Sequence, residues 1–478
     1  MALPVFKSFF WVSIERFAVL CIQFVGTVVL ARLIGPDEFG MIGILTVFIA
    51  IANMLTDSGM GGSLVREQSV SQSDYHTLFI YNGAVSLISY LILFISAPYI
   101  ASFYSIPELS SVLRVLGLSV IFTSLSITQS IHLLRNLQFK VMTVCAATSS
   151  LLATASAITM ACLDMGVWAL VAQTVGYSIF YSMSLFMVVR YIPRLVFDRQ
   201  SFRKQFSYGI NILGANVINT VQSNISTSIV GKLFSLSSTG YYTQATKLQG
   251  LPNNIIVSII DKAAFPVISK HTAIGEKVEM AETVGRYIYL LSFPLWAFCL
   301  VMAEPLIRLI LGETWVESAW IFSLLCCAGP FYTVKTILRS IFKATGDTKV
   351  IFRIDTVSSF IGIVLMTAAG FISLTWLVYS VIFTALFALA YYMTEVKRCY
   401  SYPLFKLIRS VVLAAVPPVL SAVLLSVLVS KVPFFTQSFA GLIVSLPVFV
   451  VFCSVLYLCF RNREILSICS KLSRKKSL

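Results

Sequence analysis

The chain has 478 residues, of which 58% are hydrophobic and only 12% are charged, and its mean hydropathy is +0.89. This composition excludes an ordinary soluble domain and is typical of polytopic membrane proteins. The formal net charge of +15 does not indicate nucleic acid, because nucleic-acid binding needs cations gathered on a folded polar domain, and the sequence predicts no such domain. We therefore expect no nucleic-acid partner, no cofactor and no metal site.

Runs of roughly 17 to 25 mostly apolar residues are long enough to cross a bilayer as helices. Fourteen such runs follow one another and predict an all-α polytopic membrane protein with about 14 transmembrane helices. The run at 238–260 is polar and contains Pro252. The predicted helices are 9–34, 39–63, 77–101, 109–133, 141–162, 166–190, 206–231, 238–260, 284–306, 317–338, 351–372, 374–394, 407–430 and 437–460.

Lys and Arg gather on one side of the predicted membrane, which the positive-inside rule identifies as the cytoplasmic side. Because the number of helices is even, both termini are predicted to lie on that side. The basic tail RKKSL is expected to attract anionic headgroups of membrane lipids. Of the 35 Lys and Arg residues, those expected on the outer side are Arg32, Arg114, Lys232, Arg308 and Lys431, whereas Lys247 and Lys335 lie inside helices.

A short polar corner near the N-terminus has a counterpart two hundred residues later. ARLIGPDEFG at 31–40 and GKLFSLSSTG at 231–240 align Arg32 with Lys232 and Gly40 with Gly240. LLRNLQFK at 133–140 and ILRSIFK at 337–343 are a second pair of similar segments at nearly the same spacing. These two pairs of similar segments predict an internal repeat, with two six-helix lobes related in parallel around a central cavity, which is a transporter architecture. The predicted parts are an N-lobe at 1–204, a C-lobe at 205–400, and two further helices with the basic tail at 401–478.

Three segments carry a resemblance to a known family: LARLIGPDEFG at 30–40, YYTQATKLQGLPNNIIVSIIDKAAFPVISK at 241–270 and ATGDTK at 344–349. They resemble the polysaccharide transporter family, the O-antigen, capsule and exopolysaccharide repeat-unit flippases of the multidrug/oligosaccharidyl-lipid/polysaccharide exporter superfamily. The resemblance implies two six-helix lobes with two extra C-terminal helices in the bacterial inner membrane. It also implies that an undecaprenyl-diphosphate-linked oligosaccharide is moved from the cytoplasmic to the outer leaflet by alternating access.

Such a substrate has an anionic head, so cations inside the membrane are the candidates for binding it, because a charge in a bilayer usually faces a water-filled cavity or a partner. Lys247 shares a helix face with Thr243, Gly250 and Asn254. The alternative to substrate binding is a structural role, in which the Lys247 side chain snorkels to the membrane interface or pairs with a neighbour on its helix. The other candidate cations are Arg16, Lys335 and Arg339, which we expect to converge with Lys247 on one diphosphate.

Structural alternatives also remain for these cations. Arg16 has Glu15 and Asp57 as potential partners, and Arg339 has the position of an anchor at the inner interface. Glu15 and Asp57 are at the same time the candidates for coupling to a proton or a sodium ion. A polar stripe on the seventh helix is expected to line a sugar pathway, with helix-to-helix hydrogen bonding as the alternative; it comprises Asn211, Asn219, Gln222 and Ser226.

Two other functions remain open from the sequence. A drug/cation antiporter of the same superfamily would be expected to line its cavity with acids and aromatic residues. Asp57, an acid in a predicted helix, is the residue that leaves this alternative open. A membrane polysaccharide polymerase or ligase is disfavoured, because the predicted outer loops are short and the chain has only three His residues. The expected partners are therefore the lipid-linked oligosaccharide, membrane lipids, a coupling cation and other polysaccharide-assembly proteins, and we expect a transporter without enzymatic activity.

Overall fold

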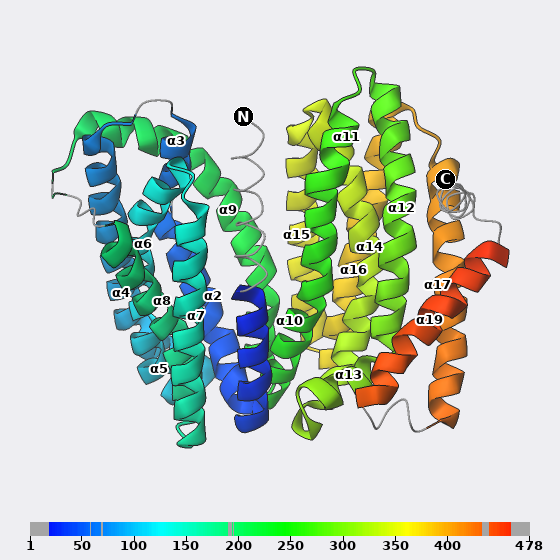
Figure 1. Ribbon diagram of the computed structural model, residues 1–478, viewed down its shortest axis with the longest axis horizontal. Helices are drawn as coiled ribbons and strands as arrows, with labels where there is room; N and C mark the ends of the chain where they lie inside the picture. The colour runs from blue at the N-terminus through cyan, green and yellow to red at the C-terminus, as the bar shows by residue number, and fades with distance from the viewer. Residues whose placement is uncertain are drawn as a thin grey trace, which may run out of the picture. The chain divides into compact units, whose positions relative to one another are not determined.

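The computed structural model describes residues 19–57, 59–67, 70–189, 194, 196–432 and 439–459, and in this part of the chain it contains helices and no strand. The chain divides into two compact units, Met1–Gly240 and Tyr241–Leu478 (Figure 1). The predicted boundary between the lobes is at 204/205. That boundary stays a prediction; the compact units divide at Gly240, because α9 (Arg199–Leu233) packs against helices of the first unit.

The first unit consists of helices that pack around an apolar core, with Ile44, Leu45, Leu113 and Val120 at its centre. Small side chains such as Ala153 and Ala157 allow α7 to pack closely along α8. Besides α9, the helices are Val19–Leu33, α2 (Pro36–Asp57), α3 (Met60–Arg66), α4 (Gln72–Tyr104), α5 (Glu108–Leu116), α6 (Leu118–Arg135), α7 (Phe139–Cys162) and α8 (Val167–Val189).

Specific polar contacts attach α9 to this unit. Asp198 precedes the helix, and its carboxylate accepts hydrogen bonds from the Ser201 hydroxyl and from the N–H groups of Gln200 and Ser201, which together lower the Asp198 pKa. Near the other end, the Tyr104 and Ser228 hydroxyls are 2.6 Å apart. The packing partners of α9 are α2, α3 and α4, and Figure 1 shows its first part beside α3.

In the second unit, α12, α14 and α16 pack side by side, α15 covers α16, and α17 and α19 lie beyond α12 (Figure 1). α10 begins in the first unit and continues through a π-helical turn, Ile260–Ala264, into α11. The helices are α10 (Leu236–Ile259), α11 (Phe265–Ser269), α12 (Ile274–Val301), α13 (Ala303–Ile310), α14 (Ser318–Thr345), α15 (Thr348–Gly370), α16 (Leu374–Tyr400), α17 (Leu404–Lys431) and α19 (Phe439–Cys459), with a 3₁₀ turn at Glu313–Trp315.

The all-helical membrane architecture is confirmed, but the described residues contain twelve helices that are long and apolar enough to span a bilayer, fewer than the predicted 14. The polar run at 238–260 is among the twelve, as part of Leu236–Ser269. Of the first predicted helix, 9–34, the structure describes Val19–Leu33, and residues 9–18 lie outside the described part. α9 has 35 residues and is long enough, but the amide and hydroxyl side chains along it make it less apolar than the twelve.

Two predicted helices are interrupted. The run at 39–63 separates into α2 and α3, and Gly59 between them has φ +71°. This left-handed conformation ends a helix and is readily adopted by glycine. The run at 109–133 separates into α5 and α6 at Gly117. Gly59 thus ends a helix, whereas Gly117 keeps helical backbone angles, and Glu108–Arg135 is still one helix long enough to span.

The two similar corners, 31–40 and 231–240, have the same local structure. A helix ends at Leu33 and the next begins at Pro36, and likewise α9 ends at Leu233 and α10 begins at Leu236. Arg32 and Lys232 are therefore each the last residue but one of a helix, and the two corners agree in local structure. In the second pair of segments, Arg135 is the last residue of α6, and Arg339 lies six residues before the end of α14 at Thr345. Each segment thus lies at the C-terminal end of its helix, and the repeat itself stays a prediction.

The starts of α2 and α10 also cross each other with mirrored contacts. A Cβ atom built on Gly40 would lie 2.2 Å from the Leu236 carbonyl oxygen, and one built on Gly240 would lie 2.0 Å from the Pro36 carbonyl oxygen. The Ser237 hydroxyl donates to the Asp37 carboxylate between them. Each contact thus has a counterpart two hundred residues away, which is the pattern that a two-fold related repeat produces. Glycine is required at both positions because backbone oxygens occupy the space of a side chain.

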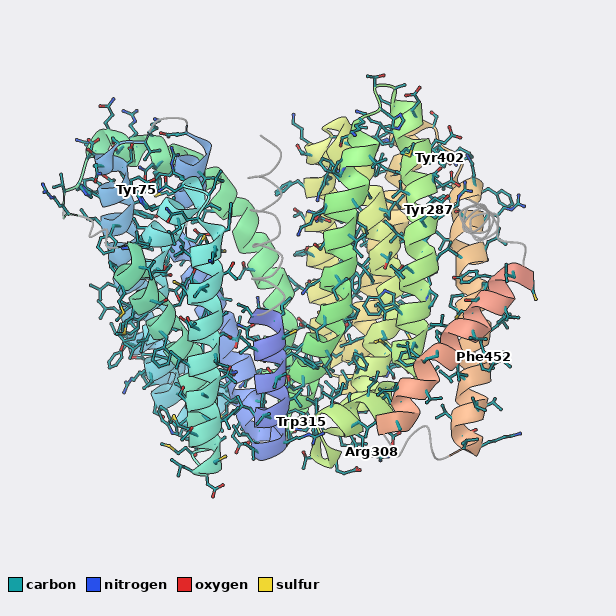
Figure 2. The ribbon with its side chains drawn as sticks, in the orientation of Figure 1. Tyr75, Tyr287, Arg308, Trp315, Tyr402 and Phe452 are labelled. Atoms are coloured by element: carbon teal, nitrogen blue, oxygen red, sulfur yellow. The ribbon has the colours of Figure 1, made fainter. Side chains whose placement is uncertain are left out.

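One end of the second unit is held by ion pairs around buried carboxylates. Glu282 accepts hydrogen bonds from Arg286, at 2.8 Å, and from the Tyr402 hydroxyl, and Glu395 pairs with Arg353 at 2.9 Å. Figure 2 shows Tyr402 at this end and Arg308 at the opposite end. Arg308 is one of the cations predicted on the outer side, and this orientation stays a prediction. Pairing of this kind is expected where cations gather at a membrane interface, because a buried carboxylate needs a partner.

Candidate substrate site

A charged cluster lies inside the second unit, formed by α14, α15 and α16. Arg339 of α14 pairs with Asp355 of α15, with 3.1 Å between Nη2 and Oδ2. The Tyr392 hydroxyl of α16 donates to Asp355 Oδ1 at 3.0 Å. Lys335 lies one turn before Arg339, and the charges of Asp355 and Arg339 both act on it. The Lys335 ammonium is 5.6 Å from the centroid of the Tyr332 ring.

The cluster lies deep along these helices. At a rise of 1.5 Å per residue, Arg339 is roughly 9 Å and Lys335 roughly 15 Å from the α14 end at Thr345. α14 has 28 residues and is therefore roughly 42 Å long, whereas the hydrocarbon core of a bilayer is about 30 Å thick. With the core centred on the helix, Lys335 lies roughly 9 Å and Arg339 roughly 3 Å inside the core. Ionised groups at such a depth are costly and usually serve a pathway or a ligand. Arg339 and Asp355 remain reachable, with side chains 39% and 26% exposed.

Lys247 and Asn254 of α10 are both exposed, and nothing lies within 4 Å of a Cβ atom built on Gly250. Three members of the predicted face therefore share one open side of the helix. Thr243, the fourth member, is buried. A lysine exposed on a membrane-spanning helix needs water, an anion or another partner near its ammonium.

The remaining predicted residues are only partly described. Arg16 and Glu15 lie outside the described residues, and the backbone of α9 is described at Asn211, Asn219 and Gln222 but their side chains are not. The structure places Asp57 at the exposed last residue of α2, in the first unit. It brings together Lys335 and Arg339; the convergence of all four cations stays a prediction.

Sequence reasoning missed Asp355, which the structure places at the centre of the cluster. A usable signal was present, because Asp355 is an acid inside the predicted helix 351–372 and an acid there is as costly as a cation. Its partner was not readable, since pairing across helices depends on how each helix is rotated. Among the described residues, no group of three or more His, Cys, Asp or Glu side chains is arranged to hold a metal ion.

Comparison with protein families and known proteins identifies relatives across most of the chain. A family model described as "Polysaccharide biosynthesis protein" matches residues 29–320. The succinoglycan biosynthesis transport protein ExoT of Rhizobium meliloti is 24% identical over 72% of this chain and 69% of its own length. The lipopolysaccharide biosynthesis protein WzxC of Escherichia coli is 22% identical over 75% of this chain and 74% of its own length.

Solved structures show the same fold at low sequence identity. The lipid II flippase MurJ, in an inward closed conformation, matches 95% of this chain and all of its own with a TM-score of 0.73 and 14% identity. An inward-facing multidrug transporter of the MATE family matches 82% of this chain and 99% of its own with a TM-score of 0.60 and 12% identity. The fold is therefore that of MurJ and the MATE transporters.

Proposed function

The chain belongs to the polysaccharide biosynthesis protein family, a family of membrane transporters, and from this premise we propose that it is a flippase for lipid-linked glycans. The proposed substrate is an undecaprenyl-diphosphate-linked oligosaccharide repeat unit. It moves from the cytoplasmic to the outer leaflet of the bacterial inner membrane by alternating access. Relatives whose names refer to succinoglycan transport and lipopolysaccharide biosynthesis support this assignment.

The observation that carries the proposal is the charge of the cluster in the second unit. Lys335 and Arg339 bring two positive charges and Asp355 only one negative charge, so the cluster is positive inside the membrane. A diphosphate is the anionic part of the proposed substrate, and an arginine fork and a lysine point charge both bind phosphate well. The exposed Lys247 adds a further cation in the same unit.

Driving force and partners belong to the same proposal. Glu15 and Asp57 are the proposed coupling groups for a proton or a sodium ion, and other polysaccharide-assembly proteins supply and use the substrate. The exposed carboxylate of Asp57 is also the observation that favours the second candidate, a drug/cation antiporter, because an acid in a membrane-spanning helix suits a cationic cargo.

The proposed orientation has both termini in the cytoplasm and the crossing of α2 and α10 outside. Asp37→Cys or Ser237→Cys should then react with a maleimide that cannot cross the membrane when it is added outside intact cells. Lys270→Cys, beyond α11 at the opposite side, is the matched control and should react only after lysis. Labelling is compared with the parent chain, which has ten native Cys residues. Labelling of Lys270→Cys alone in intact cells would invert the orientation.

Binding in detergent separates the two candidate functions. We expect the purified protein to bind undecaprenyl diphosphate, and to bind tetraphenylphosphonium, an organic cation, much more weakly. The physical reason is the positive charge of the cluster, which attracts a diphosphate and repels a cation. Tight binding of the cation with no binding of the diphosphate lipid would favour the antiporter and reject the flippase.

A further inference from the structure

We propose that Asp355 is a built-in competitor of the substrate: it holds Arg339 while the site is empty and yields it to the substrate phosphate on binding. This inference rests on the proposed function. Asp355 then acts as a positioning residue that sets how tightly the substrate is held and how readily it leaves. The proposal concerns one ion pair and its surroundings in α14, α15 and α16.

The hydrogen bonds around Asp355 keep its carboxylate in place. One oxygen, Oδ2, pairs with Arg339 Nη2 at 3.1 Å, and the other, Oδ1, accepts the Tyr392 hydroxyl at 3.0 Å. Tyr392 is fully buried, so its hydroxyl is a fixed donor. The carboxylate therefore stays beside α14 whether or not Arg339 is bound to it.

Arg339 contacts both Asp355 and Tyr392 and still has an unused donor. A guanidinium has five N–H donors in a planar fork that fits a phosphate through two parallel hydrogen bonds. Arg339 Nε is buried and has no hydrogen-bond acceptor among the described residues. An unsatisfied buried donor is costly, so an acceptor that reaches both Nε and a terminal nitrogen is favoured. A phosphate oxygen pair has that geometry.

Lys335 supplies the charge that Asp355 cannot neutralise. It forms no ion pair with any carboxylate in the described part of the chain, and its ammonium lies over the Tyr332 ring at 5.6 Å. With Asp355 bound to Arg339, one positive charge is left for an incoming anion. A phosphate attracted by Lys335 arrives one helical turn from Arg339, where it competes directly with the Asp355 carboxylate.

Exchange of Arg339 between two anions avoids an intermediate in which the guanidinium is unpaired. A bare guanidinium inside the membrane is costly, whereas a guanidinium passed from carboxylate to phosphate is paired before and after the exchange. The same carboxylate recovers Arg339 when the substrate leaves, which favours release. A site with cations alone would bind the substrate more tightly and release it more slowly, because nothing would replace the departing phosphate.

The test is the affinity for undecaprenyl diphosphate of purified variants in detergent. Asp355→Asn keeps the size of the side chain and removes the competing charge, so we expect tighter binding than in the wild type, by up to about fivefold, the upper range for a partly exposed ion pair. In a transport assay it should lower KM and the maximal rate together. Asp355→Glu should return both towards wild type. The tightening should vanish in the double variant with Arg339→Gln.

Two further variants keep the test decisive. Glu395→Gln removes the carboxylate paired with Arg353 at the end of the unit, and it should leave the affinity unchanged; equal tightening there would show a general charge effect and overturn the proposal. If Asp355→Asn does not fold, Asp355→Ser removes the same competing charge, and it should likewise bind the substrate more tightly; unchanged or weaker binding by this folded variant would overturn the proposal in its place. Unchanged or weaker binding by a folded Asp355→Asn overturns the inference alone. No binding by the wild type would instead reject the proposed function.

Discussion

Replacing Lys247 by Ala should abolish or sharply weaken transport while the protein still inserts normally into the membrane. The substitution removes an exposed ammonium from α10, and loss of one charge-assisted contact to phosphate costs on the order of 1.5 to 3 kcal/mol. This corresponds to roughly a 10- to 150-fold loss of substrate affinity. Lys247→Arg should keep part of the function because the positive charge remains, although its geometry differs.

The matched control is Lys270→Ala, which removes an exposed lysine just beyond α11. It should transport at the wild-type rate, since it lies outside the membrane-spanning helices. Both rates are measured at equal amounts of protein in the membrane. Normal transport by Lys247→Ala would show that this lysine does not bind the substrate, whereas equal loss in both variants would point to a general effect of net charge.

Substituting either glycine at the crossing of α2 and α10 should destabilise the protein. A Cβ atom at Gly40 or Gly240 would lie 2.2 Å or 2.0 Å from a backbone oxygen, so the helices must move apart. Overpacking of this kind costs about 1 to 3 kcal/mol. We expect Gly40→Ala and Gly240→Ala to lower the midpoint of thermal unfolding in detergent by similar amounts, because their contacts mirror each other.

Gly83→Ala is the control for these substitutions. Gly83 is also helical, in α4, and nothing lies within 4 Å of a Cβ atom built there. Alanine has the higher helix propensity, so this variant should be as stable as the wild type or slightly more stable. Unchanged stability in both Gly40→Ala and Gly240→Ala would mean that the crossing does not form as described.

Most of the helices could be predicted because the membrane makes apolar length a strong signal. The corner at Arg32 and its counterpart at Lys232 were also readable, since both glycines and both cations align. The break at Gly59 was not, because a single left-handed residue leaves the surrounding hydrophobic pattern intact. The attachment of α9 to the first unit depends on tertiary contacts such as Tyr104 with Ser228, which are distant in sequence.

The sequence predicts which site residues share a face of one helix, but it does not predict which residues of different helices come into contact. Lys335 and Arg339 are four residues apart, so their shared face follows from helical geometry alone. That Asp355 and Tyr392 complete the cluster depends on the packing of α15 and α16, which helical periodicity within one segment does not fix. For the same reason, the sequence could not show that Lys247 is exposed and Thr243 is buried, because this difference depends on how α10 packs.

Movement of a defined lipid between leaflets tests the central claim most directly. The purified protein is reconstituted into vesicles with a labelled undecaprenyl-diphosphate-linked oligosaccharide, and the fraction of label in each leaflet is followed with and without proton or sodium gradients. Transfer that requires the protein and fails with Lys247→Ala is the predicted result. No transfer of any lipid-diphosphate glycan, together with rapid efflux of organic cations from the same vesicles, would contradict it.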